Sequence, residues 1–271
     1  MSLKIATWNI NSVRLRLPQV LRYLNEHQPD VLCLQETKCP DDAFPTRDFQ
    51  RAGYGHFAIH GQKGYHGVAM ISRLPLTAID ARKFCGIGDA RHISAAIDDS
   101  KGGRPLRLHN FYVPAGGEEP DPEVNQKFAH KLAFLEEMRE WFASDPSMRD
   151  HGVLVGDLNI APLEHDVWSH KALVHVVSHT EIEIAALKKI QLAGAWVDAL
   201  RANVAEDQKL YTWWSYRSAD WVSADKGRRL DHVWLSPSLA ARQVAMTVLR
   251  EARGWERPSD HVPVMVELTS A

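Results

Sequence analysis

The sequence has few cysteines, no marked excess of either charge and no long apolar run. The three cysteines, Cys33, Cys39 and Cys85, are an odd number and form no C-x-x-C or zinc-finger spacing, which argues against a disulfide framework or a structural zinc site. Cys33 lies in an apolar segment and is expected to be a buried, reduced thiol. No segment is apolar over the length that a bilayer requires, and the N-terminal residues show no signal-peptide pattern. We therefore expect a cytoplasmic protein with no membrane association.

The balance of charge limits the class of partner. Lysine and arginine together number 32 and aspartate and glutamate 34, which gives a formal net charge of −2. A binder coated with lysine in the manner of a histone is therefore excluded, and long-range attraction to DNA is weak. A local basic patch is still compatible with DNA, although most charge clusters are only solvated surface. The densest candidate patch consists of Lys226, Arg228, Arg229, Arg250, Arg253 and Arg257.

Short apolar segments separated by turn residues recur along the whole chain. Segments rich in β-branched residues predict strands at 3–8, 31–35, 67–71, 93–97, 106–112, 153–158, 231–235, 244–249 and 262–268. The Gly- and Pro-containing stretches at 101–105 and 114–122 are too short to be interdomain linkers and are expected to be loops. We therefore expect a single domain over residues 1–271.

Helices are fewer than strands. Residues 18–27 and 181–192 have apolar residues at helical spacing, and Gly194 is a candidate C-cap for the latter. A third helix is expected to begin with Asp121 as N-cap and to carry an apolar stripe that starts at Val124.

Many strands with a few helices between them are typical of a four-layered α/β sandwich, in which two packed sheets, mostly antiparallel, are flanked by helices. A doubly wound nucleotide-binding fold is disfavoured, because the sequence contains neither G-x-G-x-x-G nor a P-loop.

Polar residues stand at the ends of several predicted strands. Each one alone has an ordinary explanation: Asn9 and Asp157 could form turns, and Glu36 could be a surface carboxylate. Together they are more informative, because strand ends at one edge of a sheet can converge in space. A glutamate and two aspartates accompanied by asparagines are hard oxygen ligands, which suit Mg²⁺ or Mn²⁺ and not zinc. Such an ion neutralises the charge that develops when a phosphodiester is attacked.

The order and spacing of these polar motifs resemble the exonuclease III family of abasic-site DNA repair nucleases, within the endonuclease/exonuclease/phosphatase superfamily. The motifs are N-x-N at 9–11, L-Q-E-T-K at 34–38, Y-x-P at 112–114, G-D-x-N at 156–159, T-W-x-x-Y-R at 212–217, L-D at 230–231 and S-D-H at 259–261. The resemblance covers the chain from Lys4 to Val264. It implies a DNase I-like version of the sandwich.

The resemblance also implies a Mg²⁺ site, with Mn²⁺ as a substitute. Glu36 would be the principal ligand, assisted by Asn9 and Asp260. Asp157 and Asn159, from the G-D-x-N motif, are further candidate ligands.

Five residues are implied to be catalytic. Asp157 would activate or orient the attacking water, and Asn159 would donate to the phosphate. Tyr112 would place its hydroxyl at the phosphate, and His261, held by Asp231, would bind a non-bridging oxygen. Whether Asp157 or His261 is the general base stays open, because coupled groups share a proton.

Four residues are implied to contact DNA. Trp213 would pack beside the sugar of the lesion, whereas the neighbouring Trp214 is expected in the core. Arg91 and Lys127 match basic positions of the family that hold backbone phosphates, and Arg217 ends the same motif as Trp213.

The implied activity is Mg²⁺-dependent hydrolysis of DNA phosphodiesters. It would comprise incision on the 5′ side of abasic sites, 3′–5′ degradation of duplex ends and removal of blocked 3′ termini, by a monomer acting on double-stranded DNA. Two alternatives remain open. One is a hydrolase on the same scaffold that acts on inositol phosphates, sphingomyelin or RNA tails, which would not need the 212–217 segment. The other is a non-catalytic DNA-binding protein, which would be expected to have lost a carboxylate or His261.

Overall fold

Two six-stranded sheets form the centre of the molecule. The computed structural model describes residues 2–98, 104–145 and 149–269. Along the first sheet the strands are β13 (Gln243–Val248), β14 (Val264–Thr269), β1 (Ser2–Asn9), β2 (Val31–Gln35), β4 (Val68–Ser72) and β3 (His56–His60). Along the second they are β5 (Leu76–Asp80), β6 (His92–Ile97), β7 (Leu106–Tyr112), β8 (Gly152–Asp157), β12 (Asp231–Leu235) and β9 (Val197–Asp198).

Neighbouring strands are mostly antiparallel, as predicted. Among the described residues each sheet has one parallel pair, β1 with β2 and β7 with β8. A separate small hairpin is formed by β10 (Trp213–Trp214) and β11 (Gly227–Arg228).

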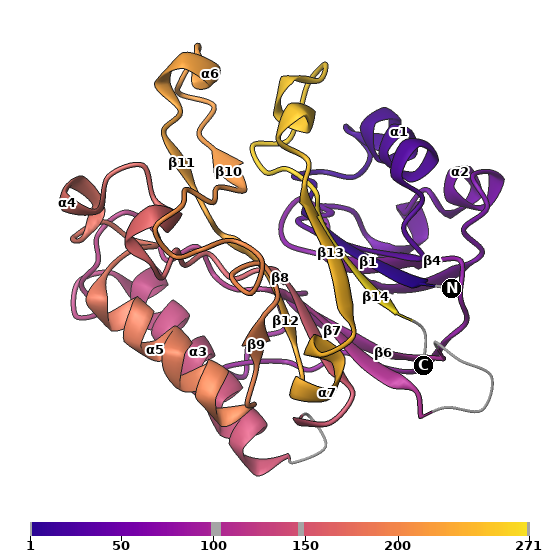
Figure 1. The fold of residues 1–271 in the computed structure, drawn as a ribbon, viewed down its shortest axis with the longest axis horizontal. Coiled ribbons are helices and arrows are strands. Elements are labelled where there is room, and N and C mark those ends of the chain that lie inside the picture. Colours follow the sequence, from indigo (N-terminus) through magenta and orange to yellow (C-terminus); the bar gives the residue numbers. More distant parts are fainter. Residues whose placement is uncertain (1, 99–103, 146–148, 270–271) are drawn as a thin grey trace.

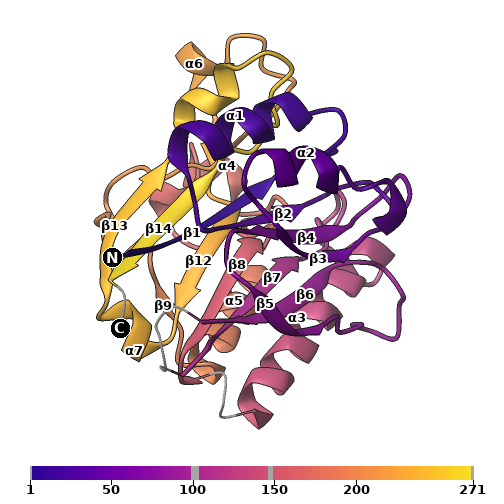
Figure 2. The same ribbon diagram turned by 90° about the vertical axis from the view of Figure 1, so that its right-hand side faces the viewer.

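Helices cover the outer faces of both sheets. The helices are α1 (Leu17–His27), α2 (Thr46–Arg51), α3 (Gln126–Ser144), α4 (His170–Leu173), α5 (Glu181–Ala193), α6 (Trp221–Ala224) and α7 (Pro237–Ala240). Figures 1 and 2 show α1 and α2 beside the first sheet, and α3 and α5 together beneath the second. Each pair is held by its own apolar cluster. The order helix, sheet, sheet, helix confirms the predicted four-layered α/β sandwich.

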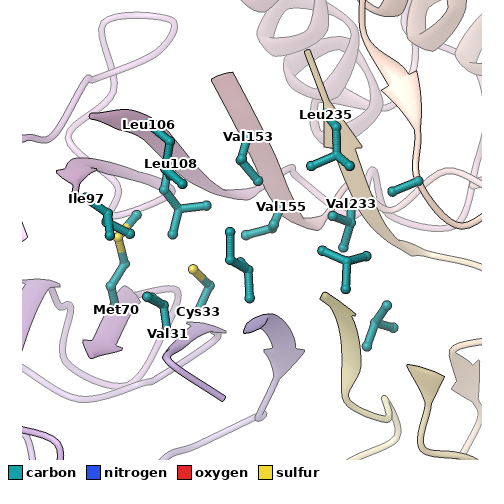
Figure 3. Close-up of a cluster of buried hydrophobic side chains, with 14 of the residues drawn as sticks. Val31, Cys33, Met70, Ile97, Leu106, Leu108, Val153, Val155, Val233 and Leu235 are labelled. Carbon is teal, nitrogen blue, oxygen red and sulfur yellow. The ribbon is translucent and has the colours of Figure 1, made fainter. Parts of the chain in front are cut away.

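The largest apolar cluster lies between the two sheets. In Figure 3, Val31, Cys33 and Met70 of the first sheet face Val155 and Val233 of the second. These side chains are fully buried, and successive residues of each strand alternate between this inner layer and the outer helical layers. The packing holds the two sheets in a fixed register and so fixes the positions of the strand ends.

The sequence prediction omitted the short hairpin of β10 and β11, the short helices α2, α4, α6 and α7, and three edge strands of the large sheets. All nine predicted strands are present with shifts of a residue or two, but β3, β5 and β9 were not predicted, and each is the last strand of its sheet. Four of the five residues of β5 are exposed, so this strand has no apolar alternation to detect. The helices predicted at 18–27 and 181–192 are confirmed, and Gly194 is the C-cap of α5.

The predicted start of the longest helix is wrong. α3 begins at Gln126 with Asn125 as N-cap, whose side chain accepts a hydrogen bond from the Lys127 amide. Asp121 instead closes a single turn, in which its carboxylate accepts from the amide of Glu123. Val124 is 73% exposed, because the apolar stripe starts only at Phe128.

The predicted basic patch is also wrong as a single surface. Arg229 is fully buried, where its guanidinium donates to Asp166 and Asp198 at 2.7–2.9 Å. Arg253 is buried as well and donates to the carbonyl of Trp214 at 3.2 Å. Adjacent residues in extended backbone point to opposite sides, so Arg228 and Arg229 lie in different environments.

The remaining expectations from composition concern cysteines, membranes and loops. Cys33 and Cys39 are buried free thiols, and Cys85 is a half-buried one. Within the described ranges no helix combines the length and apolarity needed to span a bilayer. Of the loop predicted at 101–105, residues 101–103 lie outside the described residues.

Gly156 lies where the parallel strands β7 and β8 leave no room for a side chain. Its φ is 141°, and a Cβ at this position would lie 2.0 Å from the carbonyl oxygen of Phe111. Only glycine fits here, because both the backbone conformation and the space exclude a side chain. Gly156 also precedes Asp157, so this contact sets where that carboxylate leaves the strand.

We predict that Gly156→Ala lowers the free energy of unfolding by about 2–4 kcal/mol, because the strands must separate or the backbone must strain. Denaturant unfolding followed by circular dichroism measures the change. Gly55→Ala is the matched control: no atom lies within 4 Å of its added Cβ, and the change should stay within about 0.5 kcal/mol. Equal stability of the two variants would contradict the role of Gly156.

Candidate active site

Three adjacent strands of the second sheet bring polar residues together at the same end of the sheet. β7 and β8 are parallel, so Tyr112 and Asp157, the last residues of each strand, are register partners. β12 runs antiparallel to β8, so its first residue, Asp231, pairs with Asp157. Residues 45 and 74 positions apart in the sequence therefore meet because of strand direction and register.

The first sheet supplies its polar residues to the same place. Asn9 and Gln35 end the parallel strands β1 and β2 as register partners, and Glu36 follows β2 with φ of 48°. Asn9 is fully buried and its amide donates two hydrogen bonds, to Glu36 Oε1 and to Asp157 Oδ2, each 2.9 Å long. One side chain thus joins a carboxylate of the first sheet to a carboxylate of the second.

Asp157 and Asn159 form a tight turn after β8. The amide N–H of Asn159 donates to Asp157 Oδ1 at 2.9 Å, and its side-chain amide donates to Asp157 Oδ2 at 3.2 Å and to the carbonyl of Val113 at 2.9 Å. Asn159 adopts φ of 54°, a conformation that asparagine tolerates better than most residues. The Asx-turn considered as the ordinary explanation is therefore present, and it orients both side chains at the site.

His261 lies between two buried carboxylates. Its Nδ1 is 2.8 Å from Asp231 Oδ2, and its Nε2 is 3.7 Å from Asp157 Oδ2. Burial by itself lowers the pKa of His261, but the charges of Asp231 and Asp157 outweigh it and raise the pKa to about 10. The ring is therefore an imidazolium at neutral pH, with Asp231 fixing its orientation.

The pKa of the Asp157 carboxyl group is also raised, but by a different main cause. Burial raises its pKa, the His261 cation lowers it, and the nearby charge of Asp231 raises it again, so that the net direction is upward. Because the two groups are coupled, the protonation of Asp157 depends on the positive charge that His261 carries.

Glu36 faces a different set of partners. Burial raises its pKa, but the Lys38 ammonium, 2.9 Å from Oε2, and the Asn9 amide hold the pKa below its usual range. Asp260 is also ionised more readily than usual: burial raises its pKa, while His261 and hydrogen bonds from Trp213 and other neighbours lower it. Both carboxylates keep their charge and can serve as hard oxygen ligands.

Among the described residues one cluster of three side chains has its ligand atoms close enough together to hold a metal ion, and the carboxylates of Glu36 and Asp260 are candidate ligands by their chemistry alone. Asp157, Asp231 and His261 bring one ligand atom each within 4.8 Å of one another. An imidazolium has no lone pair for a metal, and its two nitrogens already face the two carboxylates, so this triad fits a proton-holding role better. The oxygens of Glu36 and Asp260 fit Mg²⁺ or Mn²⁺ by their chemistry.

Tyr112 is buried, and burial together with the charges of Glu36 and Asp157 raises its pKa well above the ordinary value. Its hydroxyl is therefore a proton donor and not an anion. Arg91 lies beneath it, with the guanidinium 4.8 Å from the centre of the Tyr112 ring and Nη1 donating to the Tyr112 carbonyl. Arg91 is buried and forms an ion pair with Asp89, so its contacts hold the Tyr112 ring in position.

A groove of about 700 Å³ lies beside these residues. Trp213 lines it, half-buried, and donates from its indole to Asp260 Oδ2 at 2.9 Å, while Trp214 is almost fully buried, as expected. Arg217 lines the same groove with a largely exposed side chain. Lys127, exposed in the first turn of α3, lies next to Gly117 at the rim.

Sequence reasoning missed the residues that support the site. Thr212 Oγ1 donates to Asp231 Oδ2 at 2.6 Å and accepts from the amide of Asp231. Ser259 Oγ donates to the carbonyl of Asn9 at 2.7 Å, and Lys131 Nζ donates to the carbonyl of Asn159 at 2.8 Å. Lys131 had a detectable signal, since it is a charged residue on the buried face of a helix. Thr212 and Ser259 had none beyond their position in the motifs.

The sequence matches the endonuclease/exonuclease/phosphatase family over residues 6–261. Over 280 aligned residues it is 29% identical to exodeoxyribonuclease III of Haemophilus influenzae, an alignment that covers 98% of this chain and 99% of that protein.

Two solved structures are similar over almost the whole chain. An AP endonuclease of Archaeoglobus fulgidus is 35% identical, with a TM-score of 0.88 and coverage of 97% of this chain and 98% of that one. A 3′–5′ exonuclease of Neisseria meningitidis is 33% identical, with a TM-score of 0.87 and coverage of 98% and 100%. With this family match, the sandwich of two sheets and the cluster of carboxylates at their common edge, the chain belongs to the endonuclease/exonuclease/phosphatase family, and within it resembles exodeoxyribonuclease III.

Proposed function

We propose that the protein is an exodeoxyribonuclease III-like DNA repair nuclease that hydrolyses DNA phosphodiesters with the help of Mg²⁺. The observation that carries the proposal is the convergence of Asn9, Glu36, Asp157 and His261 at one edge of the two sheets, within a network of 2.8–3.7 Å contacts. The match to exodeoxyribonuclease III over nearly the full length supports the same conclusion.

The directions in which the pKa values of Asp157 and His261 are shifted indicate a separate role for each residue. Asp157, a buried carboxylate with a raised pKa, would accept the proton of the attacking water. His261, already protonated, would donate from Nε2 to a non-bridging phosphate oxygen and stabilise the charge that develops there. This assignment favours Asp157 over His261 as the general base. Tyr112 and Asn159 would add neutral donors to the same phosphate.

Glu36 would be the main metal ligand, with Asn9 and Asp260 assisting and Asp157 and Asn159 near enough in the network to contribute. The bound ion would neutralise phosphate charge and lower the pKa of a coordinated water. We infer Mg²⁺, with Mn²⁺ as a substitute, from the all-oxygen donor set.

The groove lined by Trp213 and Arg217 would hold the DNA around the lesion. The indole of Trp213 offers an apolar face to a sugar that lacks its base, while Arg217 and Lys127 would contact backbone phosphates. Arg91 would act on the DNA only through Tyr112. We further propose that the chain works as a cytoplasmic monomer with one domain, incising at abasic sites, shortening 3′ ends and clearing blocked 3′ termini.

The direct test of function is incubation with a duplex that carries one abasic site. We predict cleavage on the 5′ side of the site in the presence of Mg²⁺ and none in excess chelator, with full recovery when Mg²⁺ is restored. Gel electrophoresis of an end-labelled strand measures it. Undamaged RNA and an inositol phosphate are the comparison substrates. A preference for either of them would favour the other hydrolases of this scaffold.

Glu36→Ala tests the metal assignment. We predict that kcat/KM falls by about 100-fold or more at low Mg²⁺ and recovers partly at high Mg²⁺, because one charged ligand is lost while the other oxygens remain. Glu26→Ala is the matched control, since its carboxylate is exposed and pairs with Arg22 one helical turn away. A Mg²⁺ titration that is unchanged in Glu36→Ala would remove Glu36 from the metal site.

Asp157→Asn tests the general base. We predict a fall in kcat of about 10²–10⁴-fold with a folded protein, because the amide has nearly the same shape as the carboxylate but cannot accept the proton. Thermal melting verifies folding, and single-turnover kinetics separate chemistry from DNA binding. Retention of the wild-type rate in a folded Asp157→Asn protein would eliminate the role.

A further inference from the structure

Arg228 lies in the wall of the groove next to Trp213. It is the last residue of β11 and the register partner of Trp213 across the hairpin, and its guanidinium lies 5.5 Å from the centre of the Trp213 ring. Both residues line the same 700 Å³ groove.

The guanidinium of Arg228 has no carboxylate partner among the described residues. Its Nη1 donates to the carbonyl of Val177 at 3.0 Å and to Ser178 Oγ at 2.7 Å, both neutral groups, and its Nε is buried with no hydrogen-bond partner. Burial lowers the pKa of Arg228, and the nearest carboxylate to oppose this, Glu183, is already paired with Lys131. The adjacent Arg229, by contrast, is satisfied by two aspartates.

The guanidinium of Arg228 is a half-buried cation with neutral hydrogen-bond acceptors, so it can bind an anion that enters the groove. The free-energy cost of removing a guanidinium from water is offset when it contacts a charged partner. Its planar arrangement of N–H donors matches the oxygens of a carboxylate or a phosphate. The two bonds from Nη1 fix the plane of the guanidinium, so Arg228 is held in one orientation where it lines the groove.

The groove starts at the residues that would hold the scissile phosphate. Trp213 forms a β-bridge with His261, and its indole donates to Asp260. A group attached to that phosphate, on the side away from the departing 3′ oxygen, would therefore enter the groove along the wall that Trp213 and Arg228 form together.

We propose that Arg228 forms an oxyanion subsite that selects 3′ termini blocked by a small, negatively charged sugar fragment. The inference rests on the proposed function and deepens it. The matching substrate is a 3′-phosphate esterified with a short hydroxy acid such as glycolate, whose carboxylate would meet Arg228. Water adds to phosphorus, the P–O3′ bond breaks, and the proton of the water reaches O3′, which leaves a 3′-hydroxyl and releases phosphoglycolate.

The test compares two termini of the same shape in one duplex, a 3′-phosphoglycolate and its neutral 3′-phosphoglycolamide. For the wild-type protein we expect kcat/KM to be about tenfold or more higher for the glycolate, the usual advantage of a hydrogen bond to a charged group. In Arg228→Gln that ratio should fall to about 1, because the charge is gone. The ratio is independent of any general loss of activity, so a partly impaired variant still gives a result.

Lys226→Gln is the matched control. Lys226 lines the same groove, two residues away, with its ammonium 4.8 Å from the centre of the Trp168 ring, whereas the Arg228 guanidinium lies over the Trp213 ring. We expect Lys226→Gln to weaken both termini equally and to keep the ratio. A wild-type ratio near 1, an unchanged ratio in Arg228→Gln, or an equal loss of ratio in Lys226→Gln would each overturn the subsite.

An unmodified 3′-phosphate duplex separates this inference from the function on which it rests. It has no fragment to place in the groove, so its hydrolysis reports on the catalytic residues alone. If the wild-type protein removes the phosphate but shows no preference for glycolate, the subsite is wrong and the function stands. If it processes none of the three termini, the proposed function itself fails.

Discussion

The buried amide of Asn9 joins the two halves of the site. Its two donated hydrogen bonds bring a carboxylate from each sheet to the same nitrogen, at 2.9 Å each. Without this donor, Glu36 and Asp157 would be like charges in a poorly solvated place, and their mutual repulsion would work against the packing of the sheets. The amide therefore couples the sheet interface to the chemistry. The backbone of Asn9 is itself held in place, because the Ser259 hydroxyl donates to the Asn9 main-chain carbonyl.

Negative charge is in excess around this amide. Glu36, Asp157, Asp231 and Asp260 are met by the cations Lys38 and His261. Four carboxylates therefore face two cations, so negative charge remains although most of the side chains are hydrogen-bonded. That imbalance is physically consistent with a site built to receive a divalent cation, and it also explains why the proton on His261 is held so firmly.

A second buried network supports the phosphate-facing loop from below. Lys131 on α3 is fully buried, donates to the carbonyls of Asn159 and Ala115, and pairs with Glu183, which caps the start of α5. The two helices that cover the second sheet thus hold the turn that orients Asn159. An isolated buried ion pair contributes little to stability, but one with all its hydrogen bonds satisfied fixes geometry, and that fits its position here.

The sequence by itself determined the strand pattern, the four layers and the identity of most polar groups at the site. Eight of the nine predicted strands were predictable because they are largely buried and therefore apolar. The motifs around Asn9, Glu36 and Asp157 stand at the ends of such strands, and the motif with His261 precedes the last one. The edge strand β5 was not predictable, because an exposed strand needs no such pattern, although the exposed edge strand β13 was found from its β-branched residues. The start of α3 was missed because Asp121 and Asn125 are both good N-caps, and only the hydrogen bonds of Asn125 decide between them.

Tertiary structure alone decided which charges are free and which are paired. Arg228 and Arg229 are identical neighbours in sequence, yet one lies against Trp213 in an open groove and the other is buried between Asp166 and Asp198. The same holds for Arg91, which was expected at DNA and lies under Tyr112. Local sequence fixes on which side of a strand a residue points, but its partners come from segments far away along the chain, and only the packing of the two sheets brings them together.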